Sequence, residues 1–302
     1  MKQAYEHTKF KPESLAMISR MTAIIDTYQK QGYRLTMRQL YYQLVAKDWI
    51  PNTVESYKRI TMLGNNARLA GLLDWEAIED RTRDLVQQAS WSSASSIVEA
   101  CADQFHMDMW ATQKMRVLVV VEKEALAGVI DRTCTKWDVP YLAARGYPSV
   151  TILREIVQSY FYKASKAKQE LVILHLGDHD PSGIDMSRDL EQRFNLFANH
   201  DTPNLSIDFR RIALNREQVD ERDLPPNPAK QTDSRFKEYE QVHGDESWEL
   251  DALSPVEMDG MIVEHLEELI DRDAWEAREQ EIEEGKAKIA DAAEWMNDQE
   301  EE

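Results

Sequence analysis

The sequence has few of the residues that mark a disulfide-stapled, zinc-bound or membrane-spanning protein. It contains two cysteines in 302 residues, Cys101 and Cys134, and neither belongs to a Cys-x-x-Cys or Cys/His cluster. This argues against a disulfide framework and a structural zinc site, so we expect both thiols to be reduced and buried. No apolar run approaches the roughly 20 residues of a membrane helix, and the first residues, MKQAYEHTKF, lack an apolar signal core. We therefore expect a cytoplasmic protein without a membrane partner.

Positive charge is also scarce, but its distribution is uneven. The net charge of −19 argues at first sight against a nucleic-acid partner, because duplex binding relies on Lys and Arg contacts with phosphate. Residues 261–302, however, carry 16 acidic and 4 basic residues, whereas residues 1–70 carry 11 basic and 5 acidic residues. The beginning of the chain therefore remains suited to DNA. The acidic end either mimics DNA or keeps the protein soluble, and we favour solubility.

Helical periodicity dominates the basic beginning of the chain. Residues 12–31 place apolar side chains on one face, and Thr36 is suited to cap a second short helix over residues 37–48. A third helix follows, capped by Asn52 or Thr53, and its polar positions include the candidate phosphate contacts Lys58, Arg59 and Arg68. An exposed helix face explains these three cations equally well. Three helices with a basic third one resemble a winged-helix head.

Two continuous apolar runs predict a parallel sheet in the second half. Residues 117–121 (VLVVV) and residues 171–176 (LVILHL) are too short for buried helices, and a helical stretch separates them. Strand, helix and strand in this order favour an α/β fold. The chain is accordingly divided into a winged-helix domain (1–85), a linker helix (86–114), an α/β domain (115–270) and an acidic tail, helical or disordered (271–302).

Acidic residues follow both predicted strands directly. Glu122 comes after the first run, and Asp178 and Asp180 come after the second. The carboxyl ends of parallel strands meet at one edge of a sheet, which is where such folds bind ligands. Because Asp178 and Asp180 are two residues apart, both carboxylates point to one side of an extended segment and can share a cation such as Mg²⁺. A lone Asp-x-Asp is more often a pair of surface turn acids.

The surroundings of these acids resemble the Toprim fold. The segments VLVVVEKEALAGVI and LVILHLGDHDPSGIDMSRDL have the order and spacing of that family over about 85 residues. The resemblance implies that Glu122, Asp178 and Asp180 hold one or two Mg²⁺ ions, with Mn²⁺ as a substitute. Lys123 is either a catalytic residue that contacts phosphate or a simply solvent-exposed lysine, and Asp185 is either a further acid of the site or a helix-surface residue.

A tyrosine pair lies in the predicted second helix, TMRQLYYQL. Arg38 precedes Tyr42 by four residues and therefore shares its helix face. A free phenol has a pKa of about 10, so a nucleophilic tyrosine needs a nearby cation. Taken alone, Tyr41 and Tyr42 are more simply explained as packing residues. The segment, however, resembles the Arg-x-x-Tyr-Tyr motif in the CAP-like winged helix of the topoisomerase VI A subunit and the related meiotic double-strand-break transesterase, which implies that Tyr42 is the nucleophile.

That family joins a CAP-like winged helix to a Toprim domain, and the resemblance covers about 200 residues. Its Glu-Lys-x-Ala and Asp-x-Asp-Pro-x-Gly signatures match here, and ARGYPSVTILREI is similar to its Gly-x-Pro segment through Gly146, Pro148 and Arg154. The implied fold class is multi-domain α/β: a helical winged-helix domain, then a Toprim domain whose parallel sheet is flanked by helices. The implied activity is Mg²⁺-dependent cleavage of double-stranded DNA with a covalent bond to Tyr42.

The family also implies partners. The tyrosine of one subunit works with the metal of the other, so the expected assembly is a twofold homodimer, associated with the nucleoid when DNA is bound. No ATPase module occurs in this chain, so we expect it to bind no ATP; strand passage would need a B-type ATPase subunit in trans. Residues 222–254 do not match the family well. Their Trp248 and Leu253 are expected to pack, whereas Glu249 and Asp251 stay open between packing and support of the metal site.

Two other functions compete with this interpretation. In the first, the Toprim acids activate a metal-bound water that hydrolyses DNA, and Tyr42 serves only in binding. In the second, the protein binds DNA or a partner and its metal site is vestigial. Substitution of Tyr42 by Phe separates the first alternative from the transesterase, and binding without any cleavage would favour the second.

Overall fold

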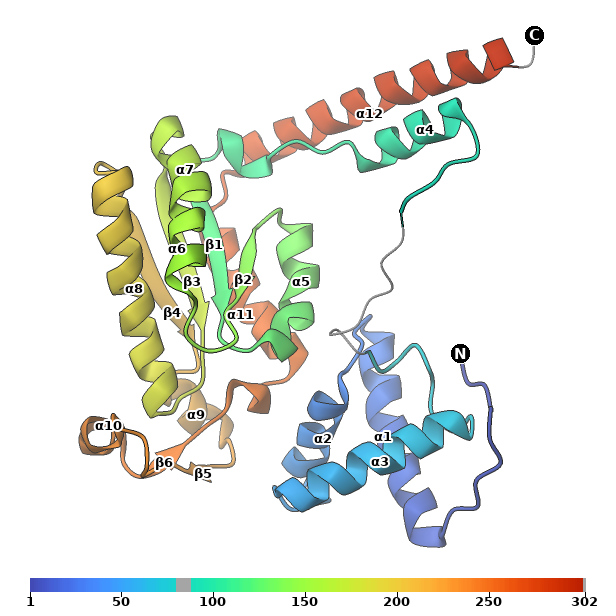
Figure 1. Ribbon diagram of the computed structural model, residues 1–302, viewed down its shortest axis with the longest axis vertical. Coiled ribbons are helices and arrows are strands. Elements are labelled where there is room, and N and C mark those ends of the chain that lie inside the picture. Colours follow the sequence, from blue (N-terminus) through green and yellow to red (C-terminus); the bar gives the residue numbers. More distant parts are fainter. Residues whose placement is uncertain (80–87, 301–302) are drawn as a thin grey trace.

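A computed structural model of the chain describes residues 1–79 and 88–300 (Figure 1). These residues form a helical head, an α/β domain and an arm of two helices. The expected boundary between head and linker, at residues 85 and 86, lies outside the described residues.

Three helices form the head, close to their expected positions: α1 (Pro12–Lys30), α2 (Met37–Ala46) and α3 (Val54–Leu69). Thr36 caps α2, because its hydroxyl accepts a hydrogen bond from Gln39 N at 3.2 Å while Gln39 Oε1 accepts one from Thr36 N at 2.8 Å. Thr53 caps α3 in the same way through Ser56 N. Because the apolar faces of all three helices meet in one core, the helical part of the sequence prediction is confirmed.

The segment after α3 differs from a winged helix. Residues 70–79 form turns, with single β-bridges from Ala70 to Ala4 and from Ile78 to Leu35. Within residues 1–79 no β-hairpin is present to serve as a wing. The assignment of the head to the winged-helix class therefore stays a prediction.

The α/β domain contains a four-stranded parallel sheet in the order β2-β1-β3-β4. Its strands are β1 (Met115–Val121), β2 (Tyr141–Ala143), β3 (Glu170–Leu176) and β4 (Ile207–Ala213). The central strands pair along their whole length, from Met115 beside Glu170 to Val121 beside Leu176. The residues that follow β1 and β3 therefore leave the sheet at the same level. The predicted parallel sheet flanked by helices is confirmed.

Alternate residues of the two central strands face two different apolar cores, which makes a layered sandwich of helix, sheet and helix. On one face, Val119 and Leu174 pack against α5 (Ala127–Lys136) and α11 (Pro255–Leu269). On the other face, Val120 and Ile173 pack against α6 (Val150–Ile156), the π-helical turn η3 (Val157–Phe161) and α8 (Pro181–Asp201). Helix α7 (Tyr162–Ala167) continues η3 into β3.

A long excursion between β4 and α11 returns the chain to the carboxyl edge of the sheet (Figure 1). It contains α9 (Arg216–Arg222), β5 (Asn227–Pro228), α10 (Phe236–His243), β6 (Glu246–Ser247) and η4 (Leu250–Ala252). A β-bridge between Trp248 and His179 attaches this excursion to the segment that follows β3. Residues 249–251 are thereby held beside the strand ends. Trp248 and Leu253 are buried, so the expectation that they pack is confirmed.

The arm consists of α4 (Ala94–Gln104) and α12 (Arg272–Glu300), which lie side by side (Figure 1). The acidic segment is therefore helical through residue 300 and is not a free tail, because Trp275 and Ile282 of α12 join the core beneath the sheet. Of the two cysteines, Cys134 is buried as expected, whereas Cys101 on α4 is exposed. Among the described helices, none combines the length and apolar character needed to cross a membrane.

Candidate active site

Glu122 and Asp178 meet at the carboxyl edge of the sheet because they directly follow the paired strands β1 and β3. The backbone N–H of Asp178 donates to Glu122 Oε2 at 2.8 Å, and Glu122 N donates to Leu176 O at 2.9 Å. Both side chains are buried. Burial, followed by the charge of Asp178, raises the pKa of Glu122 to about 7. Two carboxylates in this position create an unfavourable negative potential that a cation would relieve.

Asp180, the third predicted acid, caps α8. Its Oδ1 accepts hydrogen bonds from Gly183 N at 2.7 Å and from Ser182 Oγ at 2.8 Å. The helix consequently begins at Pro181, because Pro suits the first helical turn and Asp suits the cap. Gly183 is required here, since a Cβ at this position would overlap the carbonyl oxygen of Asp178.

Lys123 is surrounded by three carboxylates. Its Nζ lies 2.9 Å from Asp178 Oδ2, 2.6 Å from Asp251 Oδ2 and 3.2 Å from Glu249 Oε2. Burial by itself lowers the pKa of Lys123, but the charges of Asp178, Asp251 and Glu249 outweigh burial and raise it. The ammonium is therefore a fixed positive charge beside the acidic edge.

Glu249 connects this edge to the head. Its Oε2 accepts a hydrogen bond from Tyr42 OH at 2.7 Å and lies 3.2 Å from both Arg38 Nη2 and Lys123 Nζ. Burial alone raises the pKa of Glu249, but the Lys123 charge and the Tyr42 hydrogen bond outweigh it, so this pKa is lowered. Burial and the bond to Glu249 raise the pKa of Tyr42, against a smaller lowering by Arg38. One carboxylate oxygen thus holds a protonated phenol and two cations together.

The two adjacent tyrosines have different environments. Tyr41 is buried, donates its hydroxyl to Asn52 Oδ1 at 3.1 Å and accepts a hydrogen bond from Thr53 N at 2.8 Å. Its ring also contacts Tyr57 edge to face at 5.3 Å. Tyr41 therefore packs in the core of the head, which is the role expected of a tyrosine without a catalytic function. Both tyrosines line a cavity of about 330 Å³ between the head and the excursion, but only the hydroxyl of Tyr42 reaches Glu249 there.

Arg211 on β4 is a site residue that the sequence reasoning missed. Its Nη2 donates to Asp178 O at 2.7 Å and to Gly177 O at 3.0 Å, while Nη1 donates to Gly183 O at 3.1 Å. Burial lowers the pKa of Arg211 to about 10, and the charge of Glu122 partly compensates. The guanidinium therefore fixes the backbone of the Asp-x-Asp-Pro-x-Gly turn from behind. Arg211 lies in a charged strand, IDFRRIA, that matches no motif.

The three predicted phosphate contacts of α3 divide into two groups. Lys58 and Arg59 are exposed on the helix surface. Arg68 is half-buried, donates to Trp75 O at 3.2 Å and to Ile78 O at 3.3 Å, and lies over the Trp75 ring at 4.6 Å. Arg68 thus stabilises the turn after α3, whereas Lys58 and Arg59 remain available to solvent.

Two other residues near the acids have structural partners. Asp185 accepts hydrogen bonds from Tyr147 OH at 2.5 Å and from Arg235 Nε at 2.8 Å. It therefore joins the first turn of α8 to the loop after β2. His179, between the two predicted acids, is buried, and its Nδ1 lies 3.1 Å from Leu214 O. Neither contact directs a side chain toward Glu122.

The donor set suits a hard divalent cation. Glu122, Asp178 and Asp180 offer carboxylate oxygens at one edge, and oxygen ligands of this kind are those that Mg²⁺ prefers. Asp178 is partly engaged by Lys123 and by Leu250 N, and Asp180 by the start of α8. Within residues 1–79 and 88–300 as they stand, no three His, Cys, Asp or Glu side chains are grouped closely enough to hold an ion. Burial raises the pKa of Glu122, and the charges of Asp178 and Asp180 raise it further; this negative potential is the feature that a cation would fit.

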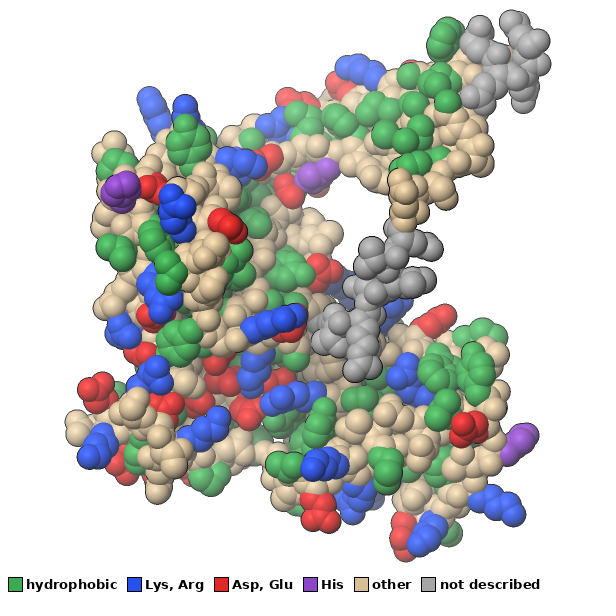
Figure 2. Space-filling view, viewed as in Figure 1, with side chains coloured by type: hydrophobic (Ala, Val, Ile, Leu, Met, Phe, Trp, Pro, Cys, Tyr) green, Lys and Arg blue, Asp and Glu red, His purple; other side chains and the backbone are tan. Residues whose placement is uncertain are grey.

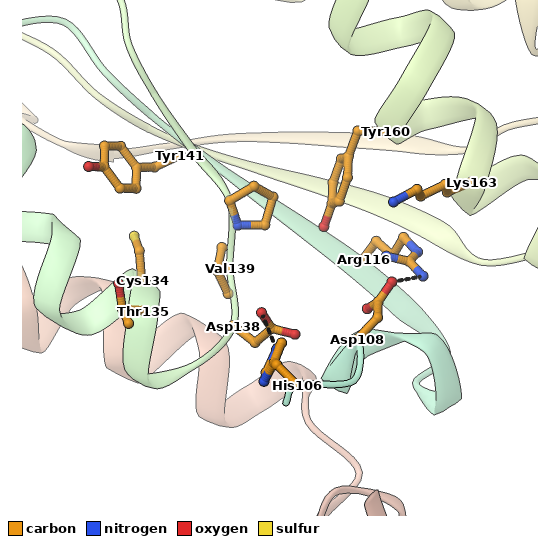
Figure 3. A pocket seen from close by; sticks show the side chains of 11 residues that line it. His106, Asp108, Arg116, Cys134, Thr135, Asp138, Val139, Tyr141, Tyr160 and Lys163 are labelled. Atoms are coloured by element: carbon orange, nitrogen blue, oxygen red, sulfur yellow. Dashed lines mark hydrogen bonds and ion pairs between the residues drawn. The ribbon is translucent and has the colours of Figure 1, made fainter. Parts of the chain in front are cut away.

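A larger cavity lies elsewhere in the α/β domain (Figure 3). It has a volume of about 720 Å³ and is lined near the start of β1 by Arg116, Asp108 and Tyr160, together with His106 and Asp138. Its charges form separate pairs, with Arg116 Nη2 2.8 Å from Asp108 Oδ2 and His106 Nε2 2.9 Å from Asp138 Oδ1. This cavity contains none of the predicted acids.

No family model, curated protein or solved structure matches this chain. The function must therefore be inferred from the residues of the site and from their geometry. Of the residues at this edge, the sequence predicted Tyr42, Arg38 and Lys123 as catalytic residues and Glu122, Asp178 and Asp180 as metal ligands. It left Glu249 and Asp251 open, although both contact Lys123.

Proposed function

We propose that the protein cleaves DNA by transesterification, with Tyr42 as nucleophile and the Toprim-like acids as the Mg²⁺ site, in the manner of the topoisomerase VI A subunit. One observation carries the proposal: Tyr42 and Lys123, which belong to two separate motifs, bind the same oxygen of Glu249. Tyr42 and Glu249 are 207 residues apart in the sequence. A pair of motifs that merely packed separate cores would not be expected to converge on one carboxylate.

The residues of this site fit the steps of such a reaction. The Tyr42 oxygen forms a bond to phosphorus while the bond from phosphorus to a deoxyribose oxygen breaks. The phenol proton passes to Glu249, whose Oε2 accepts the Tyr42 hydrogen bond at 2.7 Å, and the leaving deoxyribose oxygen takes a proton from water. Arg38 and Lys123 provide the positive charge that attracts the phosphate.

Glu122, Asp178 and Asp180 would hold the divalent cation, which when bound supplies charge stabilisation at the phosphate. Figure 2 shows acidic side chains interspersed with Lys and Arg along the part of the α/β domain that faces the head. Double-stranded DNA is the proposed substrate because exposed cations such as Lys58 and Arg59 lie on the head. Two chains bound to one duplex would cut both strands, and ATP-driven strand passage would require a separate ATPase subunit.

Supercoiled plasmid tests the proposal. Wild-type protein, Tyr42→Phe and Asp178→Ala are incubated with plasmid and Mg²⁺ or Mn²⁺, and each sample is run on a gel with and without protease treatment. We expect cut plasmid whose free migration requires protease, and we expect both variants to lose it. Tyr41→Phe is the matched control and retains cleavage, because the Tyr41 hydroxyl bonds to Asn52 and Thr53 and not to Glu249.

A hydrolytic metal-dependent nuclease is the second candidate. The raised pKa of Tyr42 favours it, because the phenol stays protonated and is less ready to attack. In this case the Tyr42→Phe variant still cuts plasmid, the product migrates freely without protease, and only Asp178→Ala is inactive. The same experiment therefore separates the two reactions.

A further inference from the structure

The head and the α/β domain of one chain are joined by a set of specific polar contacts around the site. Tyr33 OH donates to Asp259 Oδ2 at 2.5 Å, and Arg132 Nη1 donates to Gln31 O at 2.9 Å. On the other side of α2, Asn52 Nδ2 donates to Asn227 Oδ1 at 2.8 Å. Tyr42 and its bond to Glu249 lie between these contacts along the chain.

We propose that Tyr42 acts on DNA held by the acids of its own chain, so that a single chain carries a complete cleavage site and cuts one strand. This inference rests on the proposed function and extends it. The resemblance to the topoisomerase VI A subunit implies the opposite arrangement, in which the tyrosine reaches the metal of a partner subunit.

The contacts of Glu249 support action within one chain. Its carboxylate oxygen binds Tyr42 and Arg38 of the head and Lys123 of the α/β domain, and Lys123 also contacts Asp178. Arg38 and Lys123, the two cations beside this carboxylate, can hold a phosphate next to Glu249 and within reach of Tyr42. That position lies between the nucleophile and the acids of the same chain.

Action on a partner's acids would require the head to leave this position. Glu249 would then lose Tyr42 and Arg38 as partners, and the half-buried Asp259 carboxylate would lose Tyr33. Hydrogen bonds to charged groups contribute more than those between neutral groups, so breaking these three contacts is unfavourable. The stable arrangement of the chain is therefore the one in which each tyrosine faces its own acids.

Mixing two inactive variants tests the inference. Tyr42→Phe and Asp178→Ala proteins are incubated together long enough for subunits to exchange and are then given plasmid and Mg²⁺. We expect the mixture to form no more protein-linked DNA than either variant alone. Action in trans would instead restore activity to about a quarter of the sites after random exchange into dimers, and such recovery would overturn the inference. A mixture of wild type with Tyr42→Phe serves as the positive control.

A cross-linking experiment decides the same question without any DNA. Asn52→Cys and Asn227→Cys are combined with Cys101→Ser, which removes the exposed native thiol, and a short bis-maleimide is added. We expect a cross-link within one chain, seen as a faster-migrating monomer on a denaturing gel, in equal yield over a wide range of dilution. Single-cysteine variants are the controls.

A covalent dimer that requires both cysteines, or no product at all, would contradict the contact between head and α/β domain of one chain. The two experiments also distinguish the failure of this inference from the failure of the proposed function. Absence of protein-linked DNA in the wild type would refute the transesterase, and the cross-linking result would still show whether Tyr42 faces its own chain.

Discussion

The two ends of the parallel sheet differ in how their charges are arranged. At the end where β1 and β2 begin, a cavity of about 720 Å³ is lined by separate ion pairs such as Arg116 with Asp108 (Figure 3). At the carboxyl end the open space is smaller, but Lys123 is shared among three carboxylates and Glu249 among three donors.

The larger cavity and the closer clustering of charged groups therefore lie at opposite ends of the sheet. In an isolated ion pair each charge is neutralised by one partner, so the pair attracts a further ion only weakly. A shared cluster of acids and cations keeps several like charges close together, which shifts pKa values and favours binding of further charged groups. The carboxyl end is therefore the site to test, and the opposite end supplies controls.

Removing Lys123 is expected to have the largest effect on stability. Lys123→Met leaves the buried carboxylates of Asp178 and Asp251 without their cation, which should cost about 3 kcal/mol or more of unfolding free energy in metal-free buffer. The matched control is Lys163→Met in the large cavity, where an exposed side chain should change stability by less than about 0.5 kcal/mol. Urea denaturation measures the unfolding free energy of both variants. Equal losses in the two variants would contradict the proposed difference between the two ends of the sheet.

Glu249 should affect cleavage and DNA binding in opposite directions. Glu249→Gln removes the proton acceptor of Tyr42, so cleavage should slow by about 100-fold. It also frees Arg38 and Lys123 from a negative charge, so binding of a duplex at low salt should become tighter. Cleavage rates and fluorescence anisotropy measure the two effects. Glu246→Gln, which changes the same charge at an exposed position, is the control, and identical behaviour of both variants would argue against a role for Glu249.

Gly183 tests how tightly the acidic turn is packed. A Cβ at this position overlaps the carbonyl oxygen of Asp178, so Gly183→Ala should lower the free energy of unfolding by about 2 kcal/mol. Gly260→Ala in α11 has open space around its Cβ and should be neutral or stabilising by up to about 1 kcal/mol. Thermal unfolding of the two variants gives the comparison. A neutral Gly183→Ala would show that the turn relaxes easily.

The sequence predicted the parts of the site that are encoded locally. Glu122 and Asp178 directly follow apolar runs, so their place at the strand ends could be inferred from the pattern alone. Thr36 and Thr53 likewise mark helix starts because capping depends on a few neighbouring residues.

The parts that the sequence left open or missed depend on contacts between distant segments. Glu249 and Asp251, which it left open, are positioned by the β-bridge between Trp248 and His179, which no local pattern reveals. Strand β2 has only residues 141–143, and β4 contains Arg210 and Arg211, so neither has the apolar signature of β1 and β3. From the sequence, the acidic end of the chain gave no sign of packing, because its many charged residues outnumber the few apolar ones. Helix α12 nevertheless buries these few apolar residues against the rest of the protein.

His175 gives the smallest expected effect, and it tests the layer just beneath the carboxyl end. Burial, with a contribution from Arg211, lowers its pKa to about 3, so below pH 6.5 the unfolded chain binds a proton that the folded chain does not. Stability is therefore lost as the pH falls. Between pH 7 and pH 5.5 the wild type should lose about 1 kcal/mol more than His175→Gln, in which this group no longer titrates. Urea denaturation at both pH values measures the difference, and parallel losses would mean that His175 is protonated in the folded protein.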